Sequence, residues 1–240
     1  MRPFGQHFLI DEQVVHCLVN QLSDQQNKFV IEIGAGKGFI TKHLIQNGFK
    51  VLAYEIDEKV ANELRENIKS NNLEVCVRDF LNVSYEKLPT LNCCVGSIPY
   101  QISSLLIRKI ISLSFQKAVL IVQKEFADKL IALPSMKKYT FISVLAQSFY
   151  NIKKVCNISK NSFSPPPKVD SAIIVMNRKK QVPELDRYTL FLRKLFTSPN
   201  KIARNVANFP LNFQYEILEK RVRDLSVDEI IEFYKNLRSD

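Results

Sequence analysis

This chain of 240 residues has no long apolar run and no pair of cysteines at CxxC spacing. No apolar stretch approaches the roughly 18 residues that a membrane-spanning helix needs, and no charged and then apolar leader follows Met1. The five cysteines have no CxxC spacing and no histidine cluster nearby, which argues against a disulfide framework and against zinc. We therefore expect a cytoplasmic protein with reduced cysteines, no membrane contact and no metal.

The residues that are present support a folded domain with a polyanionic partner. Hydrophobic residues make up 46% of the chain, enough for the core of one large domain with a small appendage. The formal charge is +10, from 34 Lys and Arg against 24 Asp and Glu. This excess favours binding to nucleic acid, although a solvated basic surface would have the same composition.

Short apolar runs alternate with helical patterns over residues 28–122. This alternation is typical of parallel strands joined by crossover helices, so we predict an α/β sheet of the Rossmann-like type. Two further apolar segments flank residues 163–168, where three consecutive prolines exclude regular structure. We expect these segments to form two late strands that extend the sheet.

The pattern becomes helical from Pro183 onward, and Ser226 with Glu229 has the spacing of a capping box before the last helix. We therefore predict a large α/β domain over residues 1–180 and a small helical domain over residues 181–240.

The first predicted strand runs into the glycine-rich sequence GAGKG at residues 34–38, directly before a helix. Glycines there let the backbone approach a ligand at the helix amino terminus. A dinucleotide fingerprint needs its third glycine at position 39, where Phe39 stands, and no GK[ST] follows. NAD, FAD and Walker-type sites are therefore disfavoured.

Polar residues follow the next strands. Glu55 ends the second strand, where a carboxylate can accept hydrogen bonds from ribose hydroxyls, and Asp79 closes the third, where it can accept from an adenine amine. Each carboxylate alone is also explained as a solvated strand end. The three consecutive features together indicate a nucleoside site.

The tetrapeptide Ser97-Ile98-Pro99-Tyr100 follows the apolar run 93–96. Backbone carbonyls beside Pro99 and the ring of Tyr100 can orient and stack a flipped adenine, although a turn with a buried tyrosine is the plainer interpretation. A nucleoside site without phosphate-binding residues, followed by such a turn, fits S-adenosylmethionine, since its sulfonium needs no activation.

With these motifs the chain resembles the ribosomal RNA adenine N6,N6-dimethyltransferase family of the KsgA type, to which the Erm methyltransferases are related. The resemblance covers nearly the whole chain. It is carried by FGQHFL at residues 4–9, by the glycine-rich loop, by Ser97 to Tyr100 and by FSPPPKVDSA at residues 163–172.

The resemblance implies a Rossmann-like methyltransferase domain that binds S-adenosylmethionine, with Gly34 at its methionine portion, Glu55 at its ribose and Asp79 at its adenine. The cofactor residues it implies are Gln6, His7, Leu9, Gly34, Gly36, Glu55, Ile56, Asp79, Phe80 and Ser97. The catalytic residues it implies are Ser97, Ile98, Pro99, Tyr100 and Phe163. Tyr100 and Phe163 would sandwich the flipped base, each contact being worth about 1–3 kcal/mol.

The resemblance also implies a basic strip that binds RNA phosphates without reading sequence, for which a solvated basic face is the alternative. The residues of this strip are Lys137, Lys138, Lys168, Arg193, Lys194, Lys201 and Arg204. The implied activity is N6-dimethylation of adjacent adenosines in small-subunit ribosomal RNA during ribosome biogenesis, by a monomer acting on that RNA or on the immature subunit.

Two positions depart from the family pattern, because Ser97 and His7 each stand where the family usually has Asn. Ser97 keeps an acceptor but is shorter and also donates. Two alternative functions therefore stay open. One is a catalytically weak RNA-binding factor for ribosome assembly or transcription with the same fold, and the other is an Erm-like enzyme that acts on large-subunit RNA.

Overall fold

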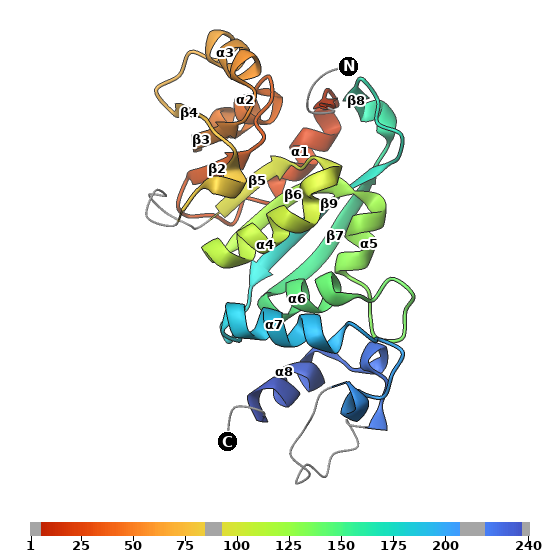
Figure 1. The fold of residues 1–240 in the computed structure, drawn as a ribbon. Coiled ribbons are helices and arrows are strands. Elements are labelled where there is room, and N and C mark those ends of the chain that lie inside the picture. Colours follow the sequence, from red (N-terminus) through yellow and green to blue (C-terminus); the bar gives the residue numbers. More distant parts are fainter. Residues whose placement is uncertain (1–5, 85–92, 207–218, 237–240) are drawn as a thin grey trace. The chain divides into compact units, whose positions relative to one another are not determined.

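The structure is a computed structural model that describes residues 6–84, 93–206 and 219–236 (Figure 1). Its contacts divide the chain into two compact units, Met1–Ala127 with Lys153–Arg178, and Asp128–Ile152 with Lys179–Asp240. The chain passes from the first unit to the second for the last time between Arg178 and Lys179, close to the predicted domain boundary at residue 180. The second unit also includes a segment from the middle of the chain, and separate folding of residues 181–240 stays a prediction.

A sheet of seven strands, in the order β4-β3-β2-β5-β6-β9-β7, organises the fold (Figure 1). The five strands expected from the apolar runs are β2 (Phe29–Ile33), β3 (Lys50–Glu55), β4 (Leu73–Val77), β5 (Cys93–Ser97) and β6 (Lys117–Gln123). Each pairs in parallel with its neighbour among these five. The two late strands are β7 (Tyr150–Ile158) and β9 (Ser171–Arg178), and β9 pairs antiparallel with β6. The predicted α/β sheet and its extension are confirmed.

The register of the sheet brings three strand ends to one edge. Ile33 on β2 lies beside Tyr54 on β3 and beside Gly96 on β5. The residues that follow these positions are Gly34, Glu55 and Ser97. The strand order reverses between β2 and β5, which is where parallel α/β sheets open a crevice for ligands.

Gly96 makes this close pairing of β2 and β5 possible. A Cβ atom at Gly96 would lie 2.2 Å from the carbonyl oxygen of Ile33, far inside van der Waals contact. Any other residue would therefore push the two strands apart just below the ligand edge.

Amphipathic helices pack on the sheet because their apolar faces join its core. The helices that follow the strands in the first half of the chain are α1 (Glu12–Asn20), α2 (Phe39–Gln46), α3 (Glu58–Asn67), α4 (Ser103–Leu113) and α5 (Lys124–Leu130). Leu18, Leu44 and Leu64 are fully buried in a core that also contains the strand valines. Burying one such leucine contributes roughly 1.5–3 kcal/mol.

A short antiparallel ribbon joins the amino-terminal segment to the proline-rich loop. β1 (Phe8–Leu9) pairs with β8 (Phe163–Ser164), so that Leu9 lies opposite Phe163. The loop predicted at residues 163–168 is therefore wrong for its first two residues, which pair before the prolines begin. Residues 160–162 form the short 3-10 helix η4 (Lys160–Ser162), and two others, η1 (Phe80–Asn82) and η3 (Tyr100–Ile102), follow β4 and β5.

The second unit is mainly helical, as the sequence predicts. Its described elements include α6 (Phe141–Phe149), α7 (Leu185–Leu195), α8 (Val227–Asn236), and the short 3-10 helices η5 (Ala203–Asn205) and η7 (Val222–Asp224). The capping box before α8 is confirmed, since the backbone N–H groups of Ser226 and Glu229 each donate to the other's side chain. The helical pattern expected at residues 215–222 is wrong for its described half. Residues 219–222 include an isolated bridge from Arg221 to Ile202 and the start of η7, and no α-helix. The other half of the pattern lies outside the described residues.

Within the ranges that the structure describes, no helix combines the length and the apolar character needed to cross a bilayer.

Candidate functional site

A cavity of about 630 Å³ opens at the carboxyl edge of the sheet, within the first unit. Its volume falls in the range of ordinary small-molecule sites. The cavity is lined by every residue that the sequence assigns to the cofactor or the target base, namely Gln6, His7, Leu9, Gly34, Gly36, Glu55, Ile56, Asp79, Phe80, Ser97, Ile98, Pro99, Tyr100 and Phe163. The two residue sets therefore share one space, as direct transfer of a group between two ligands requires.

The glycine loop and the tetrapeptide lie close together. Gly34 has a φ of +72°, a conformation that favours glycine. A Cβ atom at this position would lie 3.5 Å from the carbonyl oxygen of Ser97, which is van der Waals distance. The loop that would hold the cofactor and the turn that would hold the target amine thus meet at these two residues.

Glu55 is buried at the end of β3 and is held by backbone N–H groups. Its Oε2 accepts from the N–H of Gly36 at 2.8 Å, and its Oε1 accepts from the N–H groups of Ile56 and Asp57 at 3.0 and 3.1 Å. A carboxylate offers about four acceptor positions. One position on Oε2 therefore stays available to a ligand hydroxyl, and the carboxylate also fixes the glycine loop against β3.

Glu32 joins β2 to α2 on either side of the same loop, without lining the cavity. It is fully buried on β2, and its Oε2 accepts from the hydroxyl of Thr41 on α2 at 2.6 Å. Its Oε1 has no hydrogen-bond partner among the described residues. Burial raises the pKa of Glu32 to about 8, which the charge of Glu55 reinforces and the Thr41 hydrogen bond opposes.

Asp79 and Phe80 line the cavity where β4 ends. Asp79 begins the 3-10 helix η1, and its Oδ1 accepts from the N–H of Leu81 at 2.9 Å. Phe80 is buried and meets Tyr54 edge to face, with ring centroids 5.2 Å apart. Asp79 therefore has a structural task as well as a position beside the cavity, and its contact with a ligand adenine stays a prediction.

The amino-terminal segment crosses the cavity and is tied down at both sides. Gln6 donates from Nε2 to Asp57 at 3.3 Å, and the Nδ1 of His7 donates to the carbonyl of Pro165 at 2.7 Å. The imidazole that replaces the usual Asn thus has a partner in the proline-rich loop. Phe4 and Gly5, the first residues of the FGQHFL motif, lie outside the described residues.

The segment is fixed again where α1 begins. The side chain of Asp11 caps α1 and also accepts from the hydroxyl of Ser162 at 2.7 Å. This hydrogen bond is the largest effect on the pKa of Asp11 and lowers it. Desolvation, the second effect, raises the pKa, and the backbone N–H groups of the cap lower it again, so the net shift is downward. The carboxylate consequently stays ionised and joins the start of α1 to the residue before Phe163.

The turn after β5 holds its tyrosine in a defined direction. The hydroxyl of Tyr100 lies 2.6 Å from the Oγ of Ser171 at the start of β9. Burial raises the pKa of this hydroxyl, partly offset by the bond to Ser171, so it stays protonated. The carbonyl of Pro99 accepts from the N–H of Ile102 at the end of η3 and from the hydroxyl of Ser103 at the start of α4. The target amine would therefore meet Ser97 or the carbonyl of Ile98 rather than that of Pro99.

Phe163 is buried, lines the cavity and is placed by the pairing of β8 with β1. Its position on the same cavity as Tyr100 agrees with two rings around one base. Their stacking on a base stays a prediction.

Several lining residues were not predicted from the sequence. Ile10 is apolar yet 55% exposed, and it lines the cavity. The predicted Ile56 is likewise apolar and 46% exposed. Tyr54, Asn67 and Arg78 also line the cavity. Of these three residues, only Arg78 could have been predicted to line the cavity, because it directly precedes Asp79 at a strand end.

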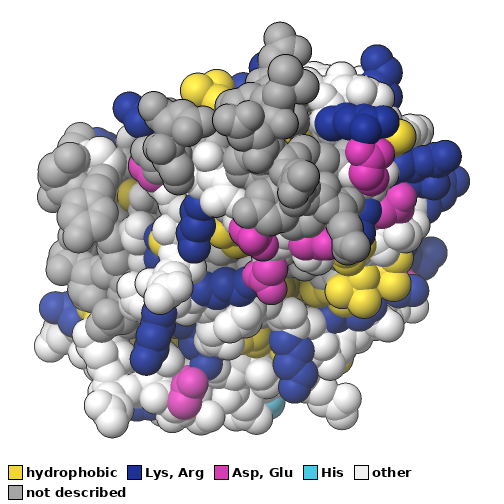
Figure 2. All heavy atoms as spheres, turned by 90° about the horizontal axis from the view of Figure 1, so that it is seen from below, with side chains coloured by type: hydrophobic (Ala, Val, Ile, Leu, Met, Phe, Trp, Pro, Cys, Tyr) yellow, Lys and Arg dark blue, Asp and Glu magenta, His cyan; other side chains and the backbone are white. Residues whose placement is uncertain are grey.

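The predicted RNA-binding residues are all exposed. Lys168 belongs to the first unit and the other six to the second. Lys138 pairs with Asp128 at 2.9 Å, and Arg204 pairs with Glu219. On the face shown in Figure 2, the described Lys and Arg side chains are spread out, with Asp and Glu side chains between them. This face carries no continuous basic strip among its described residues.

Lys168 lines a second, more open hollow of about 390 Å³ together with Lys124 and Lys160. The hollow also includes Val169 and Asp170, which directly precede the Ser171 that binds Tyr100. Lys124 and Lys160, which were not predicted to bind RNA, therefore lie beside the end of the main cavity that Tyr100 lines.

Comparison with known proteins agrees with this geometry. The chain is 36% identical over 239 residues to ribosomal RNA small subunit methyltransferase A of Thermotoga petrophila, covering 99% of this chain and 91% of that protein. A dimethyladenosine transferase from Plasmodium falciparum superposes with a TM-score of 0.83 at 28% identity, covering 95% of this chain and 98% of that one. The 23S rRNA methyltransferase ErmE superposes with a TM-score of 0.74 at 25% identity, covering 96% and 99%.

The sequence model of the ribosomal RNA adenine dimethylase family matches residues 2–238. This match spans nearly the whole chain, and it confirms the family predicted from the motifs. The chain therefore belongs to the ribosomal RNA adenine dimethylase family.

Proposed function

We propose that this chain transfers methyl groups from S-adenosylmethionine to N6 of adjacent adenosines in small-subunit ribosomal RNA. The observation that carries the proposal is the single cavity lined by both the strand-end carboxylates and the Ser97 to Tyr100 turn. Similarity to a small-subunit methyltransferase over 99% of this chain favours that subunit as the target.

The lining residues fit a nucleoside cofactor. The free acceptor position on Glu55 suits a ribose hydroxyl, and the exposed side chain of Ile56 offers an apolar surface for a base. Gly34 lines the cavity without a side chain, so the amino acid portion could approach its backbone. S-adenosylmethionine would supply a methyl group on a sulfonium that needs no activation, so the protein's work is positioning and exclusion of water.

The other lining residues of the cavity fit an adenine that is flipped out of its stack in the RNA. Tyr100, held by Ser171, and the buried ring of Phe163 would stack on the base. The Oγ of Ser97 and the carbonyl of Ile98 would accept from the exocyclic amine and turn its lone pair toward the methyl group. Because Ser97 is shorter than Asn, the carbonyl of Ile98 has the larger share in this proposal.

The RNA would be held by basic side chains near the tyrosine end of the cavity. Lys124, Lys160 and Lys168 line the adjacent hollow and are suited to phosphate groups. The predicted residues of the second unit would add further phosphate contacts. We place the reaction in the cytoplasm and expect a monomer to carry it out.

The direct test is incubation with isotope-labelled S-adenosylmethionine and either immature small subunits or large-subunit RNA, followed by mass spectrometry of nucleosides. The proposal predicts labelled N6,N6-dimethyladenosine from the small subunit alone. Transfer to large-subunit RNA would favour the Erm-like alternative, which the likeness to ErmE supports. Tight RNA binding without any methylation would favour the alternative of a catalytically weak assembly or transcription factor.

A further inference from the structure

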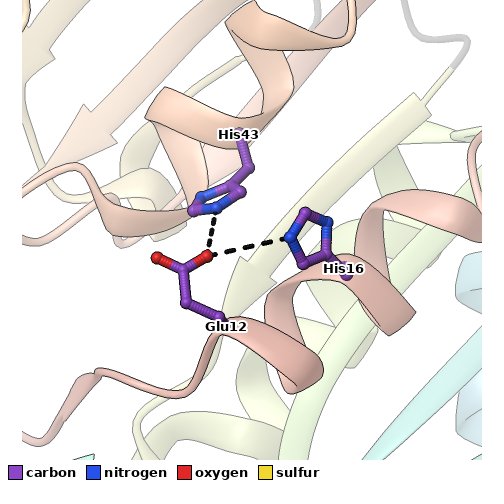
Figure 3. Close-up of side chains that lie close together, drawn as sticks. All are labelled: Glu12, His16 and His43. Atoms are coloured by element: carbon purple, nitrogen blue, oxygen red, sulfur yellow. Dashed lines mark hydrogen bonds and ion pairs between the residues drawn. The ribbon is translucent and has the colours of Figure 1, made fainter.

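Two histidines and a glutamate meet at the surface of the first unit, away from the residues assigned to cofactor and target. Glu12 and His16 are one turn apart on α1, and His43 comes from α2 (Figure 3). One potential ligand atom of each side chain lies within 4.8 Å of the other two. Figure 3 shows one oxygen of the Glu12 carboxylate facing both imidazole rings.

The hydrogen bonds of His43 decide which of its nitrogens faces Glu12. Its Nδ1 lies 2.8 Å from the carbonyl oxygen of Phe39, and a carbonyl can only accept, so Nδ1 carries a proton. Its Nε2 lies 2.6 Å from Oε2 of Glu12. A neutral Nε2 and a carboxylate oxygen are both acceptors, so this contact needs a proton or a metal cation between them.

The arrangement around His43 is also the usual one for a metal ligand. Metal-binding imidazoles commonly donate their second N–H to a backbone carbonyl, which fixes the ring. The side chain of His43 is only 6% exposed, whereas those of His16 and Glu12 are 62% and 60% exposed. The site thus has one rigid ligand and two that can adjust.

We propose that Glu12, His16 and His43 bind a transition-metal dication, for which Zn²⁺ fits best. Tetrahedral Zn²⁺ with bonds of about 2.0–2.1 Å holds its ligand atoms about 3.3 Å apart. Oε2 of Glu12 lies 2.6 Å from His43 and 3.8 Å from His16, so changes of about 0.5–0.7 Å bring both distances to that value. Two imidazoles and one carboxylate suit Zn²⁺, Co²⁺, Ni²⁺ or Cu²⁺ and disfavour Mg²⁺ or Ca²⁺.

The metal would join α1 to α2 close to the cavity. Phe39, whose carbonyl binds His43, lines that cavity, and its ring lies 5.3 Å from the imidazole of His43, centroid to centroid. The segment that crosses the cavity leads into α1, and the glycine loop leads into α2. Nothing in the sequence indicates this grouping, because His43 is 31 positions from Glu12.

The test is titration of the metal-free full chain with Co²⁺, followed by visible absorption, and then displacement by Zn²⁺. Wild type is expected to bind one Co²⁺, while His16→Ala and Glu12→Gln each bind at least about tenfold more weakly. The chain has three histidines, so His7→Ala is the matched control and is expected to bind like wild type. Zn²⁺ should raise the melting temperature of wild type and of His7→Ala, but not that of His16→Ala.

Both ligand changes are at exposed positions, so metal-free melting curves check that the variants fold. Equal Co²⁺ affinity in wild type and His16→Ala would overturn the proposal. A sulfur-to-cobalt charge-transfer band would also overturn it, because Cys17 and Cys156, with Sγ atoms 3.8 Å apart, would then be the ligands. Failure of wild type to bind either ion would reduce the site to an ion pair between His43 and Glu12.

Discussion

Tyr100 is held by one hydrogen bond, between its hydroxyl and Ser171, and its ring lines the cavity on the side of the acceptor turn. Tyr100→Ala is expected to leave the cofactor dissociation constant nearly unchanged. It should lower kcat/KM for RNA by about 5- to 150-fold, which corresponds to the loss of one stacking contact worth about 1–3 kcal/mol. Calorimetry with the cofactor and single-turnover methyl transfer measure the two effects separately.

Tyr100→Phe is the control for this change, because it keeps the ring and removes only the bond to Ser171. Tyr100→Phe is expected to lower kcat/KM for RNA by about fivefold, which corresponds to the loss of one hydrogen bond worth roughly 1 kcal/mol. If Tyr100→Ala weakened cofactor binding as much as it slowed methyl transfer, the tyrosine would be a structural residue. Its assignment to the target base would then be wrong.

Glu55 binds the N–H of Gly36, and in the proposed function its remaining acceptor position binds a ribose hydroxyl. Glu55→Ala should raise the cofactor dissociation constant by about 10- to 150-fold, corresponding to about 1.5–3 kcal/mol for a hydrogen bond to a charged acceptor. Glu55→Gln keeps an acceptor oxygen and should lie between wild type and Glu55→Ala. Unchanged affinity in calorimetry would refute the ribose assignment, provided that melting curves show a folded variant.

Ser97 differs from the residue usual in the family, and its carbonyl lies close to Gly34 of the glycine loop. Ser97→Asn should preserve or raise the rate of methyl transfer, because an amide oxygen reaches further toward the amine than a hydroxyl. Single-turnover rates at saturating cofactor and RNA measure this. A rate that drops tenfold or more would mean that the pocket has reshaped around serine.

At the scale of elements, the junction of β2 and α2 contains a buried acid whose ionisation opposes folding. The pKa of Glu32 is about 8 in the folded chain and close to 4.5 when exposed. This group's contribution to stability is therefore fully present below pH 4.5. It is lost as the pH rises toward 8, by at most about 1.4 kcal/mol per pH unit, because the unfolded chain releases a proton that the folded chain keeps.

Glu32→Gln should remove this dependence, so that its free energy of unfolding declines less than that of wild type between pH 5 and 8. Urea denaturation at several pH values measures the difference, with Glu66→Gln at an exposed position of α3 as the control. Equal pH slopes for wild type and Glu32→Gln would show that Glu32 is ionised in the folded protein.

The elements differ in how far sequence predicted them, for a physical reason. The strands β2 to β6 were predictable because each is a run of apolar residues bounded by polar ones. The β1–β8 ribbon was not, since two residues per strand give no periodicity and its register depends on distant side chains such as Asp11 and Ser162. The same holds for His16 and His43, which only the packing of α1 on α2 brings together.

At the scale of the whole molecule, the +10 charge predicted a polyanionic partner without indicating where it binds. Lys160 and Lys168 line the hollow beside the tyrosine end of the cavity. Replacing both by alanine should weaken RNA binding and reduce the slope of log affinity against log salt by about 1.4–1.8, the value for two lost phosphate contacts. Cofactor affinity should be unchanged.

Filter binding at several salt concentrations measures that slope, and a double variant of the exposed Lys59 and Lys69 removes the same charge elsewhere in the first unit. Equal slopes for the two double variants would show that the hollow does not contact RNA.

The site as a whole was more predictable than its contacts. Strand ends of a parallel sheet meet at one edge, so the order of Gly34, Glu55, Asp79 and Ser97 along the chain sufficed to place them on one cavity. What sequence did not indicate are the bonds that prepare each group. The backbone cradle of Glu55 and the bond of Tyr100 to Ser171 depend on geometry rather than on residue type.

The central claim is that one cavity holds the methyl donor and the extruded adenine so that the group passes directly between them. A crystal structure of the protein with a non-reactive analogue of S-adenosylmethionine and adenosine tests it most directly. The claim predicts the analogue at Gly34 and Glu55, and the adenine against Tyr100 with its N6 turned toward the position of the methyl group. Adenosine bound on a separate surface, or an analogue that leaves Gly34 and Glu55 untouched, would contradict it.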